Sequence, residues 1–372
     1  MSERIWWGWK YAIVALAVLA FLMLVALPLA TTVLLKNSDS PSRNLEVLQR
    51  IEDFYAVGML LFMAAWTFFL GGTLASFLNV VAWRVPRGKS ILGSSHCPSC
   101  NTQLTFRDNV PFLGWLKNWG HCSTCDAPFS SRYFFAELIL GSIFLSVAGI
   151  YLISGGYLLP FREPDRWKML NRMLLNPSSD LIAITLLHLV TLLALFTFSL
   201  VEAGKFRVPV SVFAYCLLFV VLFALIPHAV LVPWYFPFGT EFESLAWTHQ
   251  LLSLVAGLAI GFGVGCVLNR ITAATQPTDL ETGDVGELKI ANFHFNDENL
   301  QPYMQYGFSI IGVCCGWQST LVVALVWLLL RTPFRLLFGT SQYYSFLATN
   351  HSCALVACLI HLSTWKYFNQ LS

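Results

Sequence analysis

Residues 181–201 read Leu-Ile-Ala-Ile-Thr-Leu-Leu-His-Leu-Val-Thr-Leu-Leu-Ala-Leu-Phe-Thr-Phe-Ser-Leu-Val, an apolar run without a single Asp, Glu, Lys or Arg. A helix of about 20 apolar residues is long enough to cross the hydrocarbon core of a bilayer. Further runs of this kind flank it, at 11–35, 57–83, 133–153, 209–232, 249–269, 307–330 and 343–362. The sequence therefore predicts an all-α polytopic membrane protein with about eight transmembrane helices.

The composition supports the same class of protein. Of the 372 residues, 56% are hydrophobic and 11% are charged, whereas soluble domains carry about 25% charged residues. The net charge of +2 is small, and a nucleic-acid partner is not expected because such partners require a strongly basic surface. The expected surroundings are the lipid bilayer.

Lysine and arginine in the short loops predict the orientation of the helices. Basic residues are frequent in the loop at 84–132 and in the turn after residue 201, and they are missing from the loop at 233–248. With the N-terminus inside, the first two of these segments are cytoplasmic. The basic residues in the loop at 154–180 favour the opposite orientation.

The loop at 84–132 contains two Cys-x-x-Cys pairs, Cys97 with Cys100 and Cys122 with Cys125. This spacing is typical of zinc-binding loops, because four thiolates give zinc a closed tetrahedral site. Two disulfides are the alternative, and a cytoplasmic location disfavours them. We expect a small cytoplasmic zinc-binding loop in which His96 neighbours the metal without binding it.

The other six cysteines lie within or beside apolar runs, where cysteine usually behaves as a small buried hydrophobic residue. They are Cys216, Cys266, Cys314, Cys315, Cys353 and Cys358.

The residues around the cysteine loop resemble those of the type IV prepilin peptidases. The resemblance rests on three stretches, which are Ala75-Ser76-Phe77-Leu78-Asn79-Val80-Val81 with Arg84-Val85-Pro86, Asp108-Asn109-Val110-Pro111 with Gly114-Trp115-Leu116, and Ser131-Arg132-Tyr133 with Ala136-Glu137-Leu138 and Gly141. It implies a peptidase-type N-terminal region at 57–153 and a peptidase-type transmembrane region at 154–372 with a polar loop at 270–303. Residues 1–56 would then be an additional N-terminal helix and loop, which we expect to be retained rather than cleaved as a signal peptide.

This resemblance implies an aspartic-type endopeptidase in the bacterial inner membrane. Members of the family cut the leader from type IV prepilins or type II secretion pseudopilins on the cytoplasmic side. Many also methylate the new N-terminal amine with S-adenosylmethionine, and the cysteine loop belongs to the portion associated with that second activity.

The peptidases of this family use two aspartates, one protonated and one ionised. The position of the first aspartate corresponds to Glu202, seven residues before Pro209. The extra methylene of glutamate moves the carboxylate, and a misplacement of about 1 Å can reduce activity about a hundredfold. Glu202 is also readily explained as a carboxylate at a helix end, solvated or paired with Lys205.

The position of the second aspartate corresponds to Met304, which cannot transfer a proton. A fragment of the expected motif occurs earlier, at Gly283-Asp284. Asp284 is therefore the candidate second catalytic acid, and a solvated loop acid is the alternative.

Three functions remain open from the sequence. The chain could be a prepilin peptidase that uses Glu202 and Asp284, a catalytically degenerate relative that binds pilins or assists their assembly, or a descendant that retains only the methyltransferase activity. A transporter is a weaker hypothesis that would rest on His188 within a span.

Overall fold

The computed structural model describes residues 41–97, 99–153, 155–156, 159, 179–226, 246–274, 304–338 and 349–368. The expected span at 11–35 and the polar loop at 270–303, apart from its first residues, lie outside this part of the chain. The chain divides into two units, Met1–Ala65 and Trp66–Ser372. The first unit is described only by the beginning of helix α3 (Pro41–Arg84).

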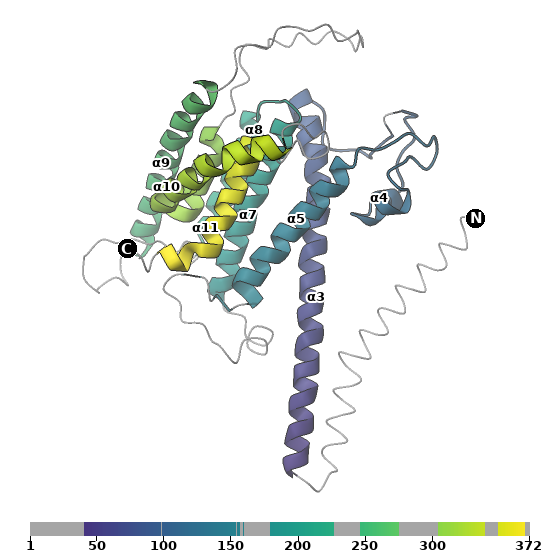
Figure 1. Cartoon of the computed structure of the whole chain (residues 1–372), viewed down its shortest axis with the longest axis vertical. Helices are drawn as coiled ribbons and strands as arrows, with labels where there is room; N and C mark the ends of the chain where they lie inside the picture. Colours follow the sequence, from purple (N-terminus) through teal and green to yellow (C-terminus); the bar gives the residue numbers. More distant parts are fainter. Residues whose placement is uncertain are drawn as a thin grey trace. The chain divides into compact units, whose positions relative to one another are not determined.

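The second unit contains the end of α3 and a succession of helices (Figure 1). They are η2 (Val85–Arg87), η3 (Phe106–Asp108), α4 (Leu113–Lys117), α5 (Arg132–Ala148), the π-helix η4 (Gly149–Ile153), α7 (Ser179–Ala203), α8 (Val210–Ala224), α9 (Ala246–Ala274), α10 (Met304–Phe338) and α11 (Asn350–Phe368). Among the described residues, strand-type pairing is limited to two isolated bridges in the cysteine loop. The all-α prediction is therefore confirmed.

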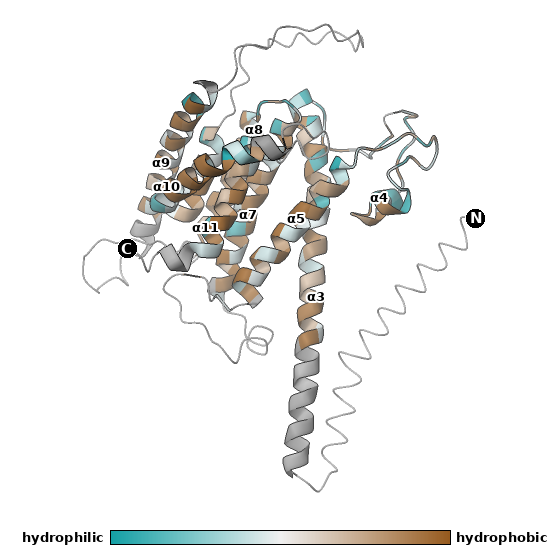
Figure 2. Ribbon diagram, in the orientation of Figure 1, coloured by the Kyte–Doolittle hydropathy of each residue, from teal (hydrophilic) through white to brown (hydrophobic). Residues whose placement is uncertain are grey.

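Within the part of the chain that the structure describes, five helices are long and apolar enough to cross a membrane. They are Val57–Arg87, Arg132–Leu152, Leu181–Ala203, Leu251–Thr272 and Met304–Phe334, and each matches one of the predicted spans. The predicted span at 209–232 is represented by the shorter apolar helix Val210–Ala224, and the one at 343–362 overlaps α11. Figure 2 shows the hydrophobic lengths of these helices and the more polar cysteine loop.

Helices α7 and α10 form the centre of the second unit. α10 packs against α7, α8, α9 and α11, and α7 also packs against α5 and η4. Both supply fully buried aromatic side chains, including Phe198 from α7 and Trp327 from α10. The Trp327 indole donates a hydrogen bond of 2.9 Å to the carbonyl of Asn350, which links α10 to the first residue of α11.

The interface between α9 and α10 depends on small residues. Gly257, Gly261 and Gly265 follow one another at a spacing of four along α9, and a Cβ atom at any of them would collide with the backbone of α10. Small residues at this spacing let two membrane helices approach closely enough for extensive van der Waals contact. α10 is therefore packed closely against α9, and it also packs against α7.

We predict that Gly261→Leu separates α9 from α10, because the added side chain collides with the backbone at Phe308. Overpacking of this kind typically costs about 1–3 kcal/mol, so the thermal unfolding temperature in detergent should fall. Gly263→Leu is the matched control on the same helix, since nothing lies within 4 Å of a Cβ atom there. Equal effects of the two substitutions would contradict the close-packed interface.

Candidate functional site

The four cysteines of the loop converge as the sequence predicts. Their sulfur atoms all lie within 4.8 Å of one another. The Cys97 and Cys125 sulfurs are 3.8 Å apart, and those of Cys100 and Cys122 are 3.9 Å apart. A tetrahedron with Zn–S bonds of about 2.3 Å places its sulfurs about 3.8 Å apart, whereas a disulfide needs about 2.05 Å. The geometry fits a zinc ion in a structural role, and all ten cysteines are free thiols.

The two halves of this metal centre are copies of one turn. The N–H of the first cysteine of each pair bonds to a carbonyl five residues later, Cys97 to Thr102 and Cys122 to Ala127, both at 2.9 Å. The residue after the second cysteine adopts a left-handed conformation in both halves, with φ of 55° at Asn101 and 56° at Asp126. Asn and Asp tolerate this conformation better than other residues with a side chain. The repeat is visible in the sequence as His-Cys-x-x-Cys followed by Asn or Asp, a signal that our sequence analysis did not use.

The surroundings of Cys100 favour the loss of its thiol proton. The Thr102 hydroxyl lies 3.2 Å from the Cys100 sulfur, and the hydrogen bonds between Cys100 and Thr102 lower the pKa of Cys100 to about 6. Because the thiolate is the form that binds metal, this environment favours metal binding near neutral pH.

Two charged residues shape the rest of the loop. The Arg84 guanidinium, at the end of α3, donates to the carbonyls of residues 90, 91, 92 and 94 at 3.0–3.4 Å. The Asp108 carboxylate accepts from Thr105 and from the Asn118 amide, the latter at 2.9 Å. Although partial burial opposes it, these hydrogen bonds and Lys117 lower the pKa of Asp108. The ionised Asp108 carboxylate therefore links Thr105 to Asn118 within the segment between the two cysteine pairs.

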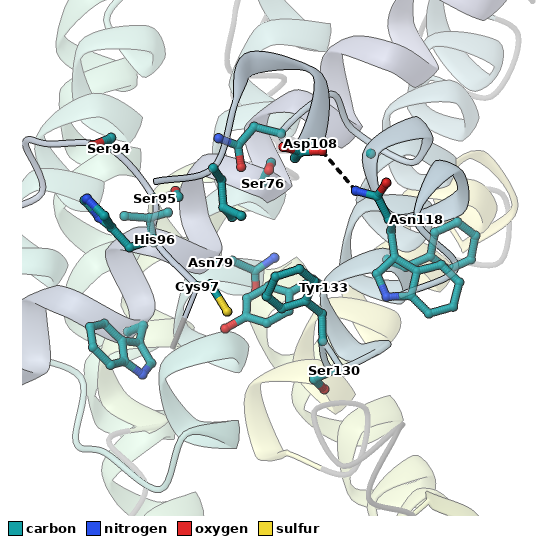
Figure 3. Close-up of a pocket in the computed structure, with 18 of the residues that line it drawn as sticks. Ser76, Asn79, Ser94, Ser95, His96, Cys97, Asp108, Asn118, Ser130 and Tyr133 are labelled. Carbon is teal, nitrogen blue, oxygen red and sulfur yellow. Dashed lines mark hydrogen bonds between the residues drawn. The ribbon is translucent and has the colours of Figure 1, made fainter. Parts of the chain in front are cut away.

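The loop, the end of α3 and the start of α5 enclose a cavity of about 880 Å³ (Figure 3). Asn79 comes from α3, Trp115 comes from the loop, and Tyr133 and Glu137 come from α5. Cys97 also borders the cavity, so the metal centre forms part of its wall. Ligand pockets in proteins typically measure about 300–1,000 Å³, and this cavity is large enough for a small molecule.

Asn79 and Trp115 both line the cavity, and each also has a buried N–H group that has no hydrogen-bond partner among the described residues. These are the Nδ2 group of Asn79 and the Nε1 group of Trp115. The Glu137 carboxylate, which is 8% exposed, accepts a hydrogen bond of 2.8 Å from the N–H of Phe112. An unsatisfied buried donor costs about 1–3 kcal/mol. Asn79 and Trp115 are therefore cavity residues whose donors the fold leaves without an acceptor among the described residues.

Glu202 lies at the end of α7, and both oxygens of its carboxylate form hydrogen bonds with the N-terminus of α11. One oxygen accepts from the backbone and side-chain N–H groups of Asn350, both at 3.0 Å. The other accepts from the backbone N–H of His351 at 3.1 Å and pairs with its Nδ1 at 2.8 Å. Glu202 therefore caps α11, where N–H groups lack partners within the helix. Its ion pair is with His351, and the described contacts include none with Lys205.

The structure brings no second carboxylate to Glu202 within the described residues. Asp284 lies outside them. Met304 is fully buried at the start of α10, where its N–H donates to the Asn269 side chain at 3.0 Å. None of the described residues after Glu202 is Asp or Glu. The assignment of Glu202 and Asp284 as catalytic acids stays a prediction.

The cysteine loop and the turn after α7 lie at the same end of the helices. The Arg87 guanidinium sits over the Phe206 ring, 4.2 Å from its centre, and Arg132 donates to the carbonyl of Leu200 at 3.0 Å. This agrees with the charge pattern, which assigned both segments to one side of the membrane.

Comparison with known proteins locates the family resemblance in this same region. Residues 69–151 match the bacterial peptidase A24 N-terminal domain. The prepilin leader peptidase/N-methyltransferase of Myxococcus xanthus is 36% identical over 116 residues, which cover 28% of this chain and 35% of the relative. The protein of Vibrio cholerae with the same name is 38% identical over 92 residues, covering 22% of this chain and 34% of the relative.

A third relative is the type 4 prepilin-like proteins leader peptide-processing enzyme of Escherichia coli. It is 35% identical over 104 residues, which cover 23% of this chain and 39% of the relative. The matches thus span little more than a third of the length of these relatives. No solved structure matches the chain.

We predict that Cys97→Ser/Cys100→Ser removes one zinc ion per chain, because it deletes half of the tetrahedral ligand set. Metal analysis of the protein purified in detergent measures the change. Cys216→Ser is the control, since Cys216 lies on α8 outside the ligand set. An unchanged zinc content in the double variant would contradict these ligands.

We also predict that Glu202→Ala destabilises the protein by about 3 kcal/mol, because it leaves the N–H groups of Asn350 and His351 without their acceptor. Thermal unfolding in detergent measures the loss. Lys205→Ala, three residues away, should change stability by less than about 0.5 kcal/mol. A variant as stable as the parent would show that the carboxylate does not cap α11.

Proposed function

We propose that this chain, whose residues 69–151 match the bacterial peptidase A24 N-terminal domain and the prepilin leader peptidases, binds the N-terminal segments of type IV pilins or type II secretion pseudopilins and methylates their N-terminal amine. The methyl donor would be S-adenosylmethionine, and the site would be the cavity beside the cysteine loop. The observation that carries the proposal is the pair of unpartnered buried donors, Asn79 and Trp115, in the wall of that cavity.

The chemistry of the cavity wall fits this ligand. Asn79 and Trp115 would bind its carboxylate or ribose oxygens, which accept hydrogen bonds. The aromatic rings of Trp115 and Tyr133 and the carboxylate of Glu137 would attract the positive charge of the donor's sulfonium. The pilin amine must lose its proton before it can accept the methyl group, and S-adenosylhomocysteine then leaves. When bound, S-adenosylmethionine supplies the methyl group. The protein side chains hold and orient the two reactants and exclude water from them.

Zinc fits the four cysteines as a structural ion in this proposal. Its tetrahedron is complete without a water molecule, and such closed sites stabilise folds rather than activate substrates. The ion would hold the two Cys-x-x-Cys turns together, so that residues on either side of these turns keep their places in the cavity wall.

The location of the cavity suits a substrate held at the membrane. The cavity lies at the end of α3 and the beginning of α5, next to the helix ends. With the cysteine loop in the cytoplasm, as its basic residues favour, a pilin helix in the inner membrane would present its N-terminus at this level.

Methyl transfer is better supported than proteolysis for two reasons. The matched residues 69–151 contain the cavity residues and stop well before Glu202. In addition, both oxygens of Glu202 are engaged by α11, whereas a catalytic carboxylate must be available to a water molecule. A peptidase reaction would require Glu202 to leave α11 and a second acid to come from outside the described residues.

The test uses the full-length protein in detergent with S-adenosylmethionine labelled on its methyl group and a pilin whose leader has already been removed. We predict label on the N-terminal amine, and about tenfold slower labelling by Asn79→Leu, since the loss of one hydrogen bond of about 1.5 kcal/mol corresponds to about tenfold. Thr73→Val is the matched control on α3, because its hydroxyl bonds only to the Phe69 carbonyl of its own helix.

The same preparation is then given an intact prepilin. Leader cleavage that disappears with Glu202→Ala, without methyl transfer, would replace the proposal by a peptidase. Pilin binding without either reaction would replace it by a binding or assembly role.

A further inference from the structure

A second group of metal-binding side chains lies inside the helix bundle, far along the chain from the cysteine loop. The Nδ1 or Nε2 atom of His188 on α7 and the sulfur atoms of Cys314 and Cys315 on α10 all lie within 4.8 Å of one another. The exposed fractions of these three residues are 2%, 2% and 0%. We propose that His188, Cys314 and Cys315 bind a zinc ion within the membrane-spanning part of the protein.

The backbone of α10 is distorted at this cluster. Gly316, the residue after Cys315, has φ of 79° and ψ of 169°, and the helix is kinked there. Adjacent residues on a regular helix do not face the same neighbour, yet Cys314 and Cys315 both approach His188. An L-residue with a side chain would be strained at this φ. Cys314 and Cys315 therefore lie immediately before a break in the helix.

The surroundings of the cluster hold the histidine ring in place. The Tyr151 ring stacks on the His188 imidazole, with the ring centres 5.2 Å apart. Tyr151 itself is fully buried. A ligand ring fixed in this way loses less freedom when a metal ion binds, which increases affinity.

The identity of the ion follows from the ligand types and the charge. Thiolate and imidazole ligands favour zinc over magnesium or calcium. Two thiolates neutralise the charge of Zn²⁺ while the imidazole stays uncharged, so the complete site carries no net charge. Neutrality matters here because an isolated charge is very costly in a low-dielectric environment.

Such a site would join helices that the sequence places far apart. His188 and Cys314 come from the two central helices, and α11 contributes Cys358, which interacts with Cys315. A zinc ion at this point would hold α7 and α10 together within the membrane, independently of the zinc in the cysteine loop and of the proposed methyl transfer.

The test is the zinc content of the full-length protein after purification in detergent and saturation with zinc sulfate. We expect two zinc ions per chain. His188→Ala/Cys314→Ser/Cys315→Ser should retain one, Cys97→Ser/Cys100→Ser should retain one, and the combined variant should retain none. Cys266→Ser, on α9 away from both clusters, is the control and should retain two.

A single zinc ion in the parent protein, lost with Cys97→Ser/Cys100→Ser, would overturn the proposal without any variant of the bundle being needed. Two ions retained by the His188/Cys314/Cys315 variant would also overturn it. As an independent readout, cobalt(II) is added to the Cys97→Ser/Cys100→Ser variant. A thiolate-to-cobalt absorption band is expected there, and its absence would count against the site.

Discussion

Inside a bilayer no water is available to hydrogen-bond with a buried polar group, so each such group needs a partner within the protein or in a ligand. This constraint explains much of the arrangement seen here. The first N–H groups of α11 are satisfied by the carboxylate of Glu202. The N–H of Met304 at the start of α10 is satisfied by the side chain of Asn269.

The same constraint gives a structural account of Glu202. The family resemblance places an aspartate at this position, and glutamate is longer by one methylene. In this structure the longer side chain reaches the N-terminus of another helix and bonds to it through both oxygens. A carboxylate at a helix N-terminus is also favoured by the helix dipole. The substitution is therefore explained by the stability of α11, and catalysis is not needed to account for it.

The sequence predicted the features that depend on neighbouring residues. Apolar runs gave five of the spans, because the length and hydropathy of a segment are sufficient to define one. The spacing of Cys97, Cys100, Cys122 and Cys125 gave the metal centre, since each pair is held by its own turn. The sequence also contains the repeated Cys-x-x-Cys turn and the regularly spaced glycines of α9, whose roles become clear in the structure.

Contacts between distant segments could not be predicted in this way. Glu202 and Asn350 are 148 residues apart, and no local pattern indicates that α11 begins beside α7. In the sequence, His188 supports only a weak transporter hypothesis, and its proximity to Cys314 and Cys315 of α10 is seen only in the structure. Asn79 was recognised within a motif, but its role as an unpartnered donor requires the cavity, which forms only when α3, the loop and α5 come together.

Some buried polar groups have partners supplied by the fold, and others do not. Glu202 and Trp327 have clear partners within the C-terminal helices, so these residues are accounted for by folding. Asn79 and Trp115 are not accounted for by folding, because each leaves a buried donor unused among the described residues. Selection for stability alone would favour an apolar side chain at such positions. A ligand that accepts both hydrogen bonds explains why they are polar, and both residues lie within the region matched to the peptidase family.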